Sequence, residues 1–595
     1  MPASARTLGP SYGLAAAAGM LLGCSLALDF DECTADSQCM TADGQGTCVD
    51  NKCVPPSANP TSDSTGPQGD TTSPDPTTGN EPEDTGESTL EVTATTTSPT
   101  DTTAGPGTDS STGDVACAVH SECEASLGDG FVCIEGACVN ALSSECQTLT
   151  WPSMGSHDKV VFLGSIIPSS DPYAPLTLPL QNALQLAIAD YNKTTDLPGG
   201  NKIAWITCDD QGKVDKALAA AEHLTGTLKI QAIVGPIFSE QVLAVADIAK
   251  NAGAFVITPT ATAKEITTLD DDGLVWRTIT SDAYQSNAVA DRLLELEPPA
   301  MRVALLNKDD AYGNGIASDV FGRLMPLFGQ LLTVHPYPDP TTMTPQDLMI
   351  AYGTILAQAW GPMGQHPDTI ILAGTTEVEN LILGTILLWN SENPPPPLPR
   401  FIVTHGAVPS MEDTINNANL PMPLKQPVMA VLEGTAPVVF DAENFASFNA
   451  RYKAVFNEQD AITASSLSYD AGMLVMFAMA AIPMGEPVTG AAIRDNIAKL
   501  QDPMGTKVSF GDVDGLTLTF IKTAHNALVT DKTVDLKGVS GELTFDLVTG
   551  EVRTDYLGWG LVPKMGDPNV PVLTPQRIYV LQPPPSEVGM WMDLP

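Results

Sequence analysis

The sequence predicts an α/β fold built on parallel sheets, and two observations support this prediction. From about residue 158 to the end, short β-branched runs alternate with amphipathic segments, the pattern of parallel strands joined by helices. Within this region, residues 230–268 contain a complete strand, turn, helix, strand and turn. The residues before about 155 are instead dominated by clustered cysteines and by a Thr/Ser/Pro-rich stretch. The α/β region is therefore expected to form the main folded body.

Composition excludes some function classes and indicates a compartment. The 595 residues are enough for several domains, and the net charge of −43 argues against binding nucleic acid or an anionic membrane surface. Ten of the eleven cysteines lie within the first 146 residues. Such clustering is typical of proteins from an oxidising compartment.

The first 23 residues have the pattern of a secretory signal. Arg6 precedes a short apolar core, Leu14–Leu22, which is too short to span a bilayer. The core runs into Leu21-Leu22-Gly23-Cys24, which resembles the bacterial lipoprotein cleavage box, so Cys24 is predicted to be lipidated. An ordinary signal peptide is the alternative. The expected location is the cell envelope, in the periplasm or at the outer membrane or cell surface, with a lipid anchor in the membrane.

Two cysteine-rich repeats are predicted, at residues 24–53 and 117–146. Each repeat is too small for a hydrophobic core and is expected to depend on two disulfides, for which four cysteines allow three pairings. Coordination of zinc by these cysteines is the alternative, but neither repeat contains a paired C-x2-C motif. Cys146 is left over and is predicted to bridge to Cys208. The cysteines of the two repeats are Cys33, Cys39, Cys48 and Cys53, and Cys117, Cys123, Cys133 and Cys138.

Residues 54–116 form a low-complexity segment that separates the repeats. It consists mainly of Thr, Ser, Pro, Gly, Asp and Glu and contains no lysine or arginine. Such a segment cannot bury enough apolar surface to offset its chain entropy, so it is predicted to be a disordered, extended linker that acts as a stalk.

The first half of the α/β region supplies its elements in a regular order. Strands are predicted at 159–164, 203–208, 230–234 and 254–257, and helices at 178–192 and 214–224. A further helix begins near Ser239, which has the position of an N-cap, and ends at Gly253. The turns after 234 and 257 therefore lie at the carboxyl ends of neighbouring parallel strands, where open α/β sheets bind small molecules.

The second half repeats this alternation. Residues 274–279 lead into a crossover, a strand and an acidic turn follow from Met301, and short strands are predicted at 369–373 and 401–404. The run Met473–Ile482 is strongly apolar, but about ten residues cannot cross a membrane. This run is therefore predicted to be a core helix.

The segment GPIFSEQVLAVADIAKNAGAFVITPTATAKEIT resembles the core signature of the type 1 periplasmic binding proteins, in the branched-chain amino acid (Leu/Ile/Val) receptor family of ABC importers. Further similar segments follow in the family's order: RTITSDAYQSNAVADRLLE, LLNKDDAYGNG, YDAGMLVMFAMAAI and GVSGELTFDLVTGE. The resemblance implies two doubly wound lobes with three hinge crossings over residues 155–580. The first lobe would comprise about 155–279 and 437–540, and the second about 280–436 and 541–580.

The resemblance also implies a ligand site between the lobes. The positions that correspond to the family's ligand contacts are Ser239, Thr260, Thr262, Tyr312, Thr375, His405 and, through a looser alignment, Tyr173. The alternative is structural: Ser239 would cap its helix, the threonines would form turns, and Tyr312 would pack at the edge of a cleft.

Two positions depart from the family pattern. Thr375 stands where amino-acid binders have a tyrosine, and His405 stands where an acidic residue pairs with the ligand's ammonium group. Glu377 is close enough in sequence to compensate for the missing acid. A buried ammonium needs a partner, so an amide or another carboxylate fits this sequence as well as an amino acid does.

No catalytic constellation competes with binding. From residue 155 onwards the sequence has no G-x-S-x-G, H-E-x-x-H or G-x-x-x-x-G-K motif. The run Asp270–Asp272 fits a solvated turn better than a calcium site, so the protein is predicted to be no enzyme and to need no cofactor or metal. The expected function is capture of a small polar solute for an ABC permease or for sensing. The alternative is a scaffold that binds other envelope proteins on the same fold.

Overall fold

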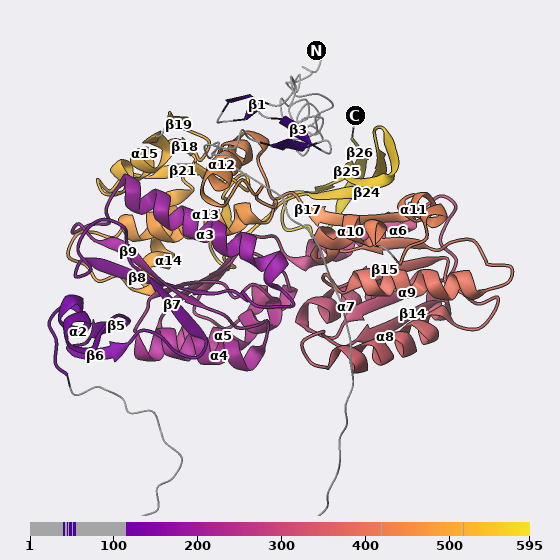
Figure 1. Ribbon diagram of the computed structural model, residues 1–595, viewed down its shortest axis with the longest axis horizontal. Helices are drawn as coiled ribbons and strands as arrows, with labels where there is room; N and C mark the ends of the chain where they lie inside the picture. The colour runs from indigo at the N-terminus through magenta and orange to yellow at the C-terminus, as the bar shows by residue number, and fades with distance from the viewer. Residues whose placement is uncertain are drawn as a thin grey trace, which may run out of the picture. The chain divides into compact units, whose positions relative to one another are not determined.

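The computed structural model describes residues 115–417, 419–515 and 517–594, together with the backbone of four short strands nearer the N-terminus (Figure 1). These strands belong to a separate compact unit, Leu26–Ser111, and form two antiparallel pairs. They are β1 (Met40–Thr41), β2 (Gly44–Gln45), β3 (Thr47–Val49) and β4 (Lys52–Val54). The predicted signal peptide, the lipidation of Cys24, the disulfides of the first repeat and the linker all lie outside the described residues.

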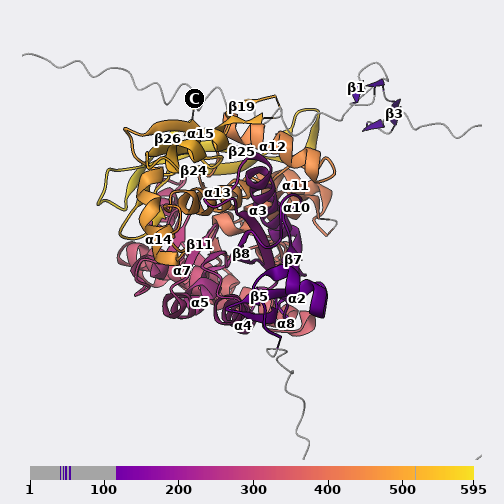
Figure 2. The ribbon, with the colours of Figure 1, turned by 90° about the vertical axis from the view of Figure 1, so that its left-hand side faces the viewer.

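The second cysteine-rich repeat is a small unit with one helix, α2 (His120–Leu127), and one hairpin, β5 (Phe131–Ile134) with β6 (Ala137–Asn140). Its disulfides are Cys117–Cys133 and Cys123–Cys138, so the first cysteine pairs with the third and the second with the fourth. Val132 and Ala141 are fully buried in the same hydrophobic cluster as residues of the first lobe. The repeat therefore packs on that lobe, beside β7 (Figure 2).

The first lobe is organised around an eight-stranded sheet in the order β22-β23-β12-β11-β10-β8-β9-β7. The five strands from β12 to β9 are parallel neighbours, as the alternating pattern predicts. The strands are β7 (Cys146–Thr150), β8 (Val160–Ile166), β9 (Lys202–Cys208), β10 (Ala232–Val234), β11 (Phe255–Thr258), β12 (Val275–Arg277), β22 (Phe545–Asp546) and β23 (Glu551–Val552).

Helices cover both faces of this sheet (Figure 1). On one face, α3 (Ala174–Thr194) packs against α13 (Ser465–Ala480), every residue of which is buried, which confirms the prediction of a core helix around Met473. On the other face lie α4 (Val214–Glu222) and α5 (Ser239–Ala252). The lobe is completed by α12 (Ala442–Val455), α14 (Gly490–Asn496) and α15 (Thr519–Leu528). Among the described residues, no helix combines the length and the apolar character that crossing a bilayer requires.

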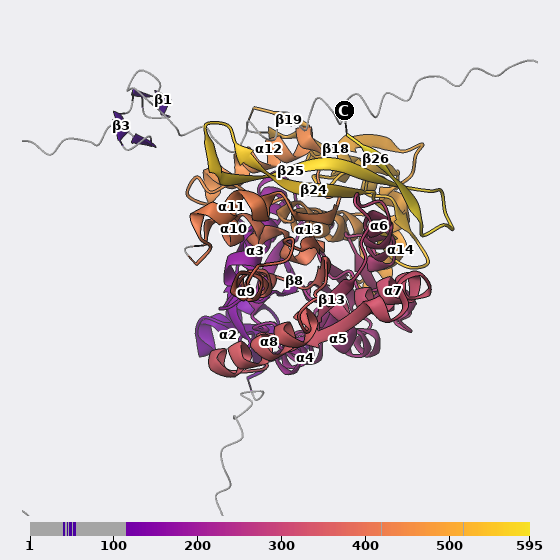
Figure 3. The same cartoon turned by 90° about the vertical axis from the view of Figure 1, so that its right-hand side faces the viewer.

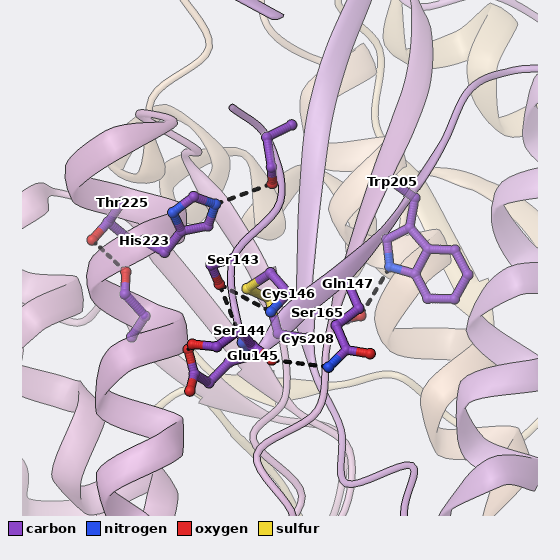
Figure 4. The surroundings of a disulfide bond; sticks show 12 residues. Ser143, Ser144, Glu145, Cys146, Gln147, Ser165, Trp205, Cys208, His223 and Thr225 are labelled. Carbon is purple, nitrogen blue, oxygen red and sulfur yellow. Dashed lines mark hydrogen bonds between the residues drawn. A yellow bond between two sulfur atoms is a disulfide. The ribbon is translucent and has the colours of Figure 1, made fainter. Parts of the chain in front are cut away.

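The leftover cysteine pair forms a disulfide, as predicted. Cys146 in β7 and Cys208 in β9 are register partners, and their sulfur atoms are bonded (Figure 4). The backbone N–H of Cys146 also donates to the Ser143 hydroxyl at 3.0 Å. The disulfide therefore fixes the lead-in segment as the antiparallel edge of the first sheet, which is why this lobe begins at 146 rather than at about 155.

The second lobe has its own eight-stranded sheet, in the order β14-β13-β15-β16-β17-β24-β25-β26. Its first five strands are parallel, and the long strands β24 and β25 add an antiparallel edge (Figure 3). The strands are β13 (Val303–Lys308), β14 (Leu332–Tyr337), β15 (Thr369–Ala373), β16 (Arg400–Val403), β17 (Leu432–Pro437), β24 (Tyr556–Lys564), β25 (Asp567–Leu581) and β26 (Gly589–Asp593). Its helices are α6 (Asp282–Leu294), α7 (Ala311–Phe328), α8 (Pro345–Trp360), α9 (Val378–Ser391), α10 (Met411–Asn416) and α11 (Met422–Met429).

The chain crosses between the lobes three times: after β12, after β17 and after β23. The sequence places the last crossing near 540, but β22 and β23 still pair with the first sheet, so the crossing lies between Val552 and Tyr556. The second sheet also continues to Asp593 rather than ending near 580. Two-residue strands carry too little periodicity to be recognised in a sequence, which explains the misplaced boundary.

Candidate ligand-binding site

A cavity of about 110 Å³ lies between the two lobes, at the carboxyl ends of strands from both sheets. Six of the seven side chains expected from the sequence line it: Ser239, Thr260, Thr262, Tyr312, Thr375 and His405. Tyr173 is not among the lining residues, but its ring packs behind Phe238, which lines the cavity, at 4.6 Å between ring centroids. The other lining residues are mostly apolar: Leu176, Leu180, Ile237, Asp310, Gly406, Pro409 and Ala464.

Ser239 reaches the cavity because of the tight turn that follows β10. Gly235 has a φ of +101°, and a Cβ there would lie 2.2 Å from the carbonyl oxygen of Ile166, so a glycine is required. The turn starts α5 at Ser239, whose side chain does not cap the helix; the N-cap position belongs to Phe238. The Ser239 Oγ instead accepts from the backbone N–H groups of Thr262 at 3.2 Å and Ala263 at 3.1 Å.

This arrangement leaves a hydrogen-bond donor for a ligand. With two N–H groups already donating to the Ser239 oxygen, its own O–H has no acceptor among the described residues. The first N–H groups of α5 also lack partners within the helix and lie at the positive end of its dipole. Thr260 is less available as a donor, because its hydroxyl donates to the Ile237 carbonyl at 2.8 Å. The first-lobe wall is therefore suited to a carboxylate.

The tyrosine and threonine of the second lobe are held by their neighbours. The Tyr312 hydroxyl donates to Thr404 Oγ1 at 2.8 Å and accepts from the Gly406 N–H at 3.2 Å. The Thr375 hydroxyl donates to Glu377, which also accepts from the Thr375 N–H at 2.8 Å. Glu377 is buried and does not line the cavity, so it does not replace the acid that His405 displaces.

The protonation of His405 follows from its hydrogen bonds. The Gln285 side-chain amide donates to the Thr435 carbonyl at 3.2 Å and to its hydroxyl at 2.8 Å, so the Gln285 oxygen faces His405. His405 Nδ1 lies 2.7 Å from that oxygen and must carry the proton. Burial lowers the pKa of His405 to about 4, so the ring is neutral at physiological pH. Nε2 is then an acceptor, and it has no hydrogen-bond partner among the described residues.

The acidic residue that lines the cavity, Asp310, is already engaged. It caps α7 by accepting from the Gly313 N–H at 2.8 Å, and its other oxygen lies 3.1 Å from Lys308 Nζ. The acidic turn that contains Asp310 is visible in the sequence. No sequence pattern identified the apolar lining residues or Gln285. Leu176 and Leu180 look like an ordinary helix face, and nothing in the local sequence marks them as facing a ligand.

A second buried acid, Asp282, lies next to this site. It begins α6 at the first crossing, and its backbone N–H donates to the Thr262 carbonyl at 2.8 Å. Burial raises the pKa of Asp282 from its ordinary value of 3.8 to about 8, although Thr262 and Arg277 oppose the shift. Between pH 3.8 and about pH 8, Asp282 is protonated in the folded protein and ionised in the unfolded protein. The contribution of Asp282 to stability therefore falls as pH rises through this range.

We expect the Asp282→Asn variant to lose this pH dependence, because asparagine has the same shape and does not ionise. The difference in free energy of unfolding, variant minus wild type, should increase by at least about 1 kcal/mol from pH 5 to pH 8. Urea unfolding at both pH values measures this difference, with the exposed Asp514→Asn as the matched control. Equal pH slopes for wild type and Asp282→Asn would show that Asp282 does not titrate in this window.

The comparisons with known proteins agree with this architecture. The profile of a family described as "Periplasmic binding protein" matches residues 160–341. The Leu/Ile/Val-binding protein BraC3 of Rhizobium johnstonii is 32% identical over 159 residues, which are 26% of this chain and 42% of that relative. The Leu/Ile/Val-binding protein of Escherichia coli K12 is 29% identical over 182 residues, 30% of this chain and 48% of that relative. The matched segments thus span less than half of these relatives.

A solved structure extends the likeness over both lobes. The leucine binding protein LivK from Thermotoga maritima superposes with a TM-score of 0.50 at 18% identity and covers 70% of this chain and 97% of that one. At this identity the superposition establishes the fold. The chain therefore has the two-lobed fold of the type 1 periplasmic binding proteins, and part of its sequence is similar to the Leu/Ile/Val-binding proteins.

Proposed function

We propose that the protein is an extracytoplasmic solute-binding protein that captures a small carboxylate between its lobes for ABC import or for sensing. The observation that carries this proposal is the cavity, whose walls come from both lobes and which presents the Ser239 hydroxyl and the N-terminus of α5 as donors. Such donors at a helix N-terminus suit an anion. The predicted lipid anchor at Cys24 and the acidic linker would hold this domain away from a membrane.

The size of the cavity supports a small ligand with an apolar body. Its volume of about 110 Å³ is of the same order as an engineered apolar cavity of about 150 Å³ that binds benzene. Leu176, Leu180 and Phe238 give the first-lobe wall its apolar surface. The names of the relatives say that they bind leucine, isoleucine and valine, and solutes of that size are the first to test here.

Thermal unfolding of the full chain against a panel of amino acids, amides and small carboxylates tests the proposal. A ligand that binds the folded state stabilises it by about 2.7 kcal/mol at a hundredfold excess over Kd. We expect a clear upward shift with at least one panel member. No shift with any member would overturn solute binding and favour the scaffold alternative, for which a pull-down from envelope extracts is the next experiment.

Replacing Ser239 with alanine should weaken binding of that ligand by about 10- to 150-fold, because a hydrogen bond to a charged group contributes about 1.5–3 kcal/mol. The shift is measured from the variant's own ligand-free midpoint, since the Thr262 and Ala263 N–H groups also lose their acceptor. The exposed Ser391→Ala, at the end of α9, is the matched control. An unchanged affinity would remove Ser239 from the site.

A further inference from the structure

We infer that the cavity selects a small apolar hydroxy acid over the corresponding amino acid. The carboxylate would meet Ser239 and the N-terminus of α5, and an uncharged hydroxyl would donate to His405 Nε2. The apolar body would lie against Leu176, Leu180 and Phe238. This inference rests on the proposed function and specifies the chemical class of its ligand.

His405 presents a neutral hydrogen-bond acceptor to the cavity. Because the Nδ1–H group donates a hydrogen bond to the Gln285 oxygen at 2.7 Å, the ring presents a neutral acceptor at Nε2 rather than an anion. A hydroxyl group donates one hydrogen bond to such an acceptor and brings no charge that needs compensation. His405 thereby supplies a hydrogen-bond acceptor for the hydroxyl group of a hydroxy acid at this end of the cavity.

The described residues that line the cavity offer no carboxylate with a free oxygen for an ammonium group. Of the described residues that line the cavity, Asp310 carries the one carboxylate, and its two oxygens are already engaged by the Gly313 N–H at 2.8 Å and by Lys308 Nζ at 3.1 Å. Lys308 also lies 5.4 Å from the centre of the Phe238 ring, which itself lines the cavity. An ammonium placed here would lose its hydration and would have to compete with Lys308 and the Gly313 N–H for the oxygens of Asp310.

The opposite wall of the cavity favours an anion. The Ser239 hydroxyl has both of its acceptor positions filled by backbone N–H groups, at 3.2 and 3.1 Å, and is left to donate. A ligand with a carboxylate at this wall and a hydroxyl at the other satisfies both sets of polar groups. The apolar residues between these two walls would contact the apolar body of the ligand.

Calorimetric titration of the full chain with three matched compounds tests this inference. Leucine, 2-hydroxy-4-methylpentanoate and 4-methylpentanoate share one carbon skeleton and differ in carrying an ammonium, a hydroxyl or neither. We expect the hydroxy acid to bind about tenfold more tightly than each of the others. If leucine binds as tightly or more tightly, the inference is wrong while the proposed function stands. If none of the three binds, the inference is wrong, and the broader panel decides the proposed function.

Variants at position 405 sharpen the test. His405→Glu supplies the missing anion and is expected to raise the affinity for leucine about tenfold or more and to lower that for the hydroxy acid. His405→Gln keeps a neutral acceptor and should retain the wild-type preference, so it guards against a variant that fails to fold. If a folded His405→Glu protein still binds the hydroxy acid more tightly than leucine, the role assigned to His405 is wrong.

Discussion

Replacing Lys308 with methionine is expected to lower the free energy of unfolding by about 3–5 kcal/mol, the effect of breaking a buried ion pair by removing one partner. Lys308 ends β13 with its side chain 2% exposed, and its Nζ lies 2.5 Å from Asp339 and 3.1 Å from Asp310. Burial lowers the pKa of Lys308, but Asp310, Tyr173 and nearby acids raise it more, so the pKa lies well above its ordinary value. The variant would leave two carboxylates without their cation.

The same substitution should also weaken the contact between the lobes. Lys308 belongs to the second lobe, yet its Nζ lies 3.3 Å from the hydroxyl of Tyr173 in the first lobe and 5.5 Å from the centre of that ring. Denaturant unfolding measures the stability, and the double variant Lys308→Met/Asp339→Asn is the control, since it removes one of the orphaned charges. We expect the double variant to recover part of the loss. A loss below about 1 kcal/mol in Lys308→Met would contradict the ion-pair account.

The second large effect is expected at the hinge. Arg277 ends β12 with its side chain fully buried; it donates to the Ala263 carbonyl at 2.9 Å and forms an ion pair with Glu551. Glu551 lies in β23, so the pair joins the strand that enters the first crossing to the strand that enters the last one. Arg277→Met would leave Glu551 buried without a charge partner, and we expect a loss of about 3–5 kcal/mol in the free energy of unfolding.

The control for this prediction is Arg277→Met/Glu551→Met, in which both charges are gone. Replacing a buried pair by apolar residues of similar volume is often close to neutral, so the double variant should be clearly more stable than Arg277→Met alone. Chemical denaturation of the three proteins gives the comparison. Equal losses in the single and the double variant would show that the packing of Arg277, rather than its charge pair, holds the hinge.

The local pattern was sufficient to predict that Ser239 lies at a strand end, where it lines the cavity. A β-branched run that ends at Gly235, followed by Ser239 and a helix that stops at Gly253, places a polar group at a strand end. The interpretation of Ser239 as a helix cap was wrong, because its oxygen accepts from the Thr262 and Ala263 N–H groups 23 and 24 residues away. That distinction depends on how two turns meet, and propensity within one segment does not contain it.

The second-lobe wall depends on contacts that are remote in sequence. The family resemblance supplied Tyr312 and His405, but the donor and acceptor roles of the His405 ring are set by Gln285, which is 120 residues away. Gln285 is itself oriented by Thr435, which lies 150 residues from Gln285 in the sequence. Such chains of hydrogen bonds exist only in the folded protein, so no local pattern could have predicted the charge state of the cavity.

The most direct test of the binding site is a crystal structure of the full chain grown with the tightest solute from the titrations. We expect density for the solute in the cavity between the lobes, with its carboxylate within hydrogen-bond distance of Ser239 Oγ and a donor group next to His405 Nε2. A solute bound elsewhere on the protein, with this cavity filled by water, would contradict the account of the site.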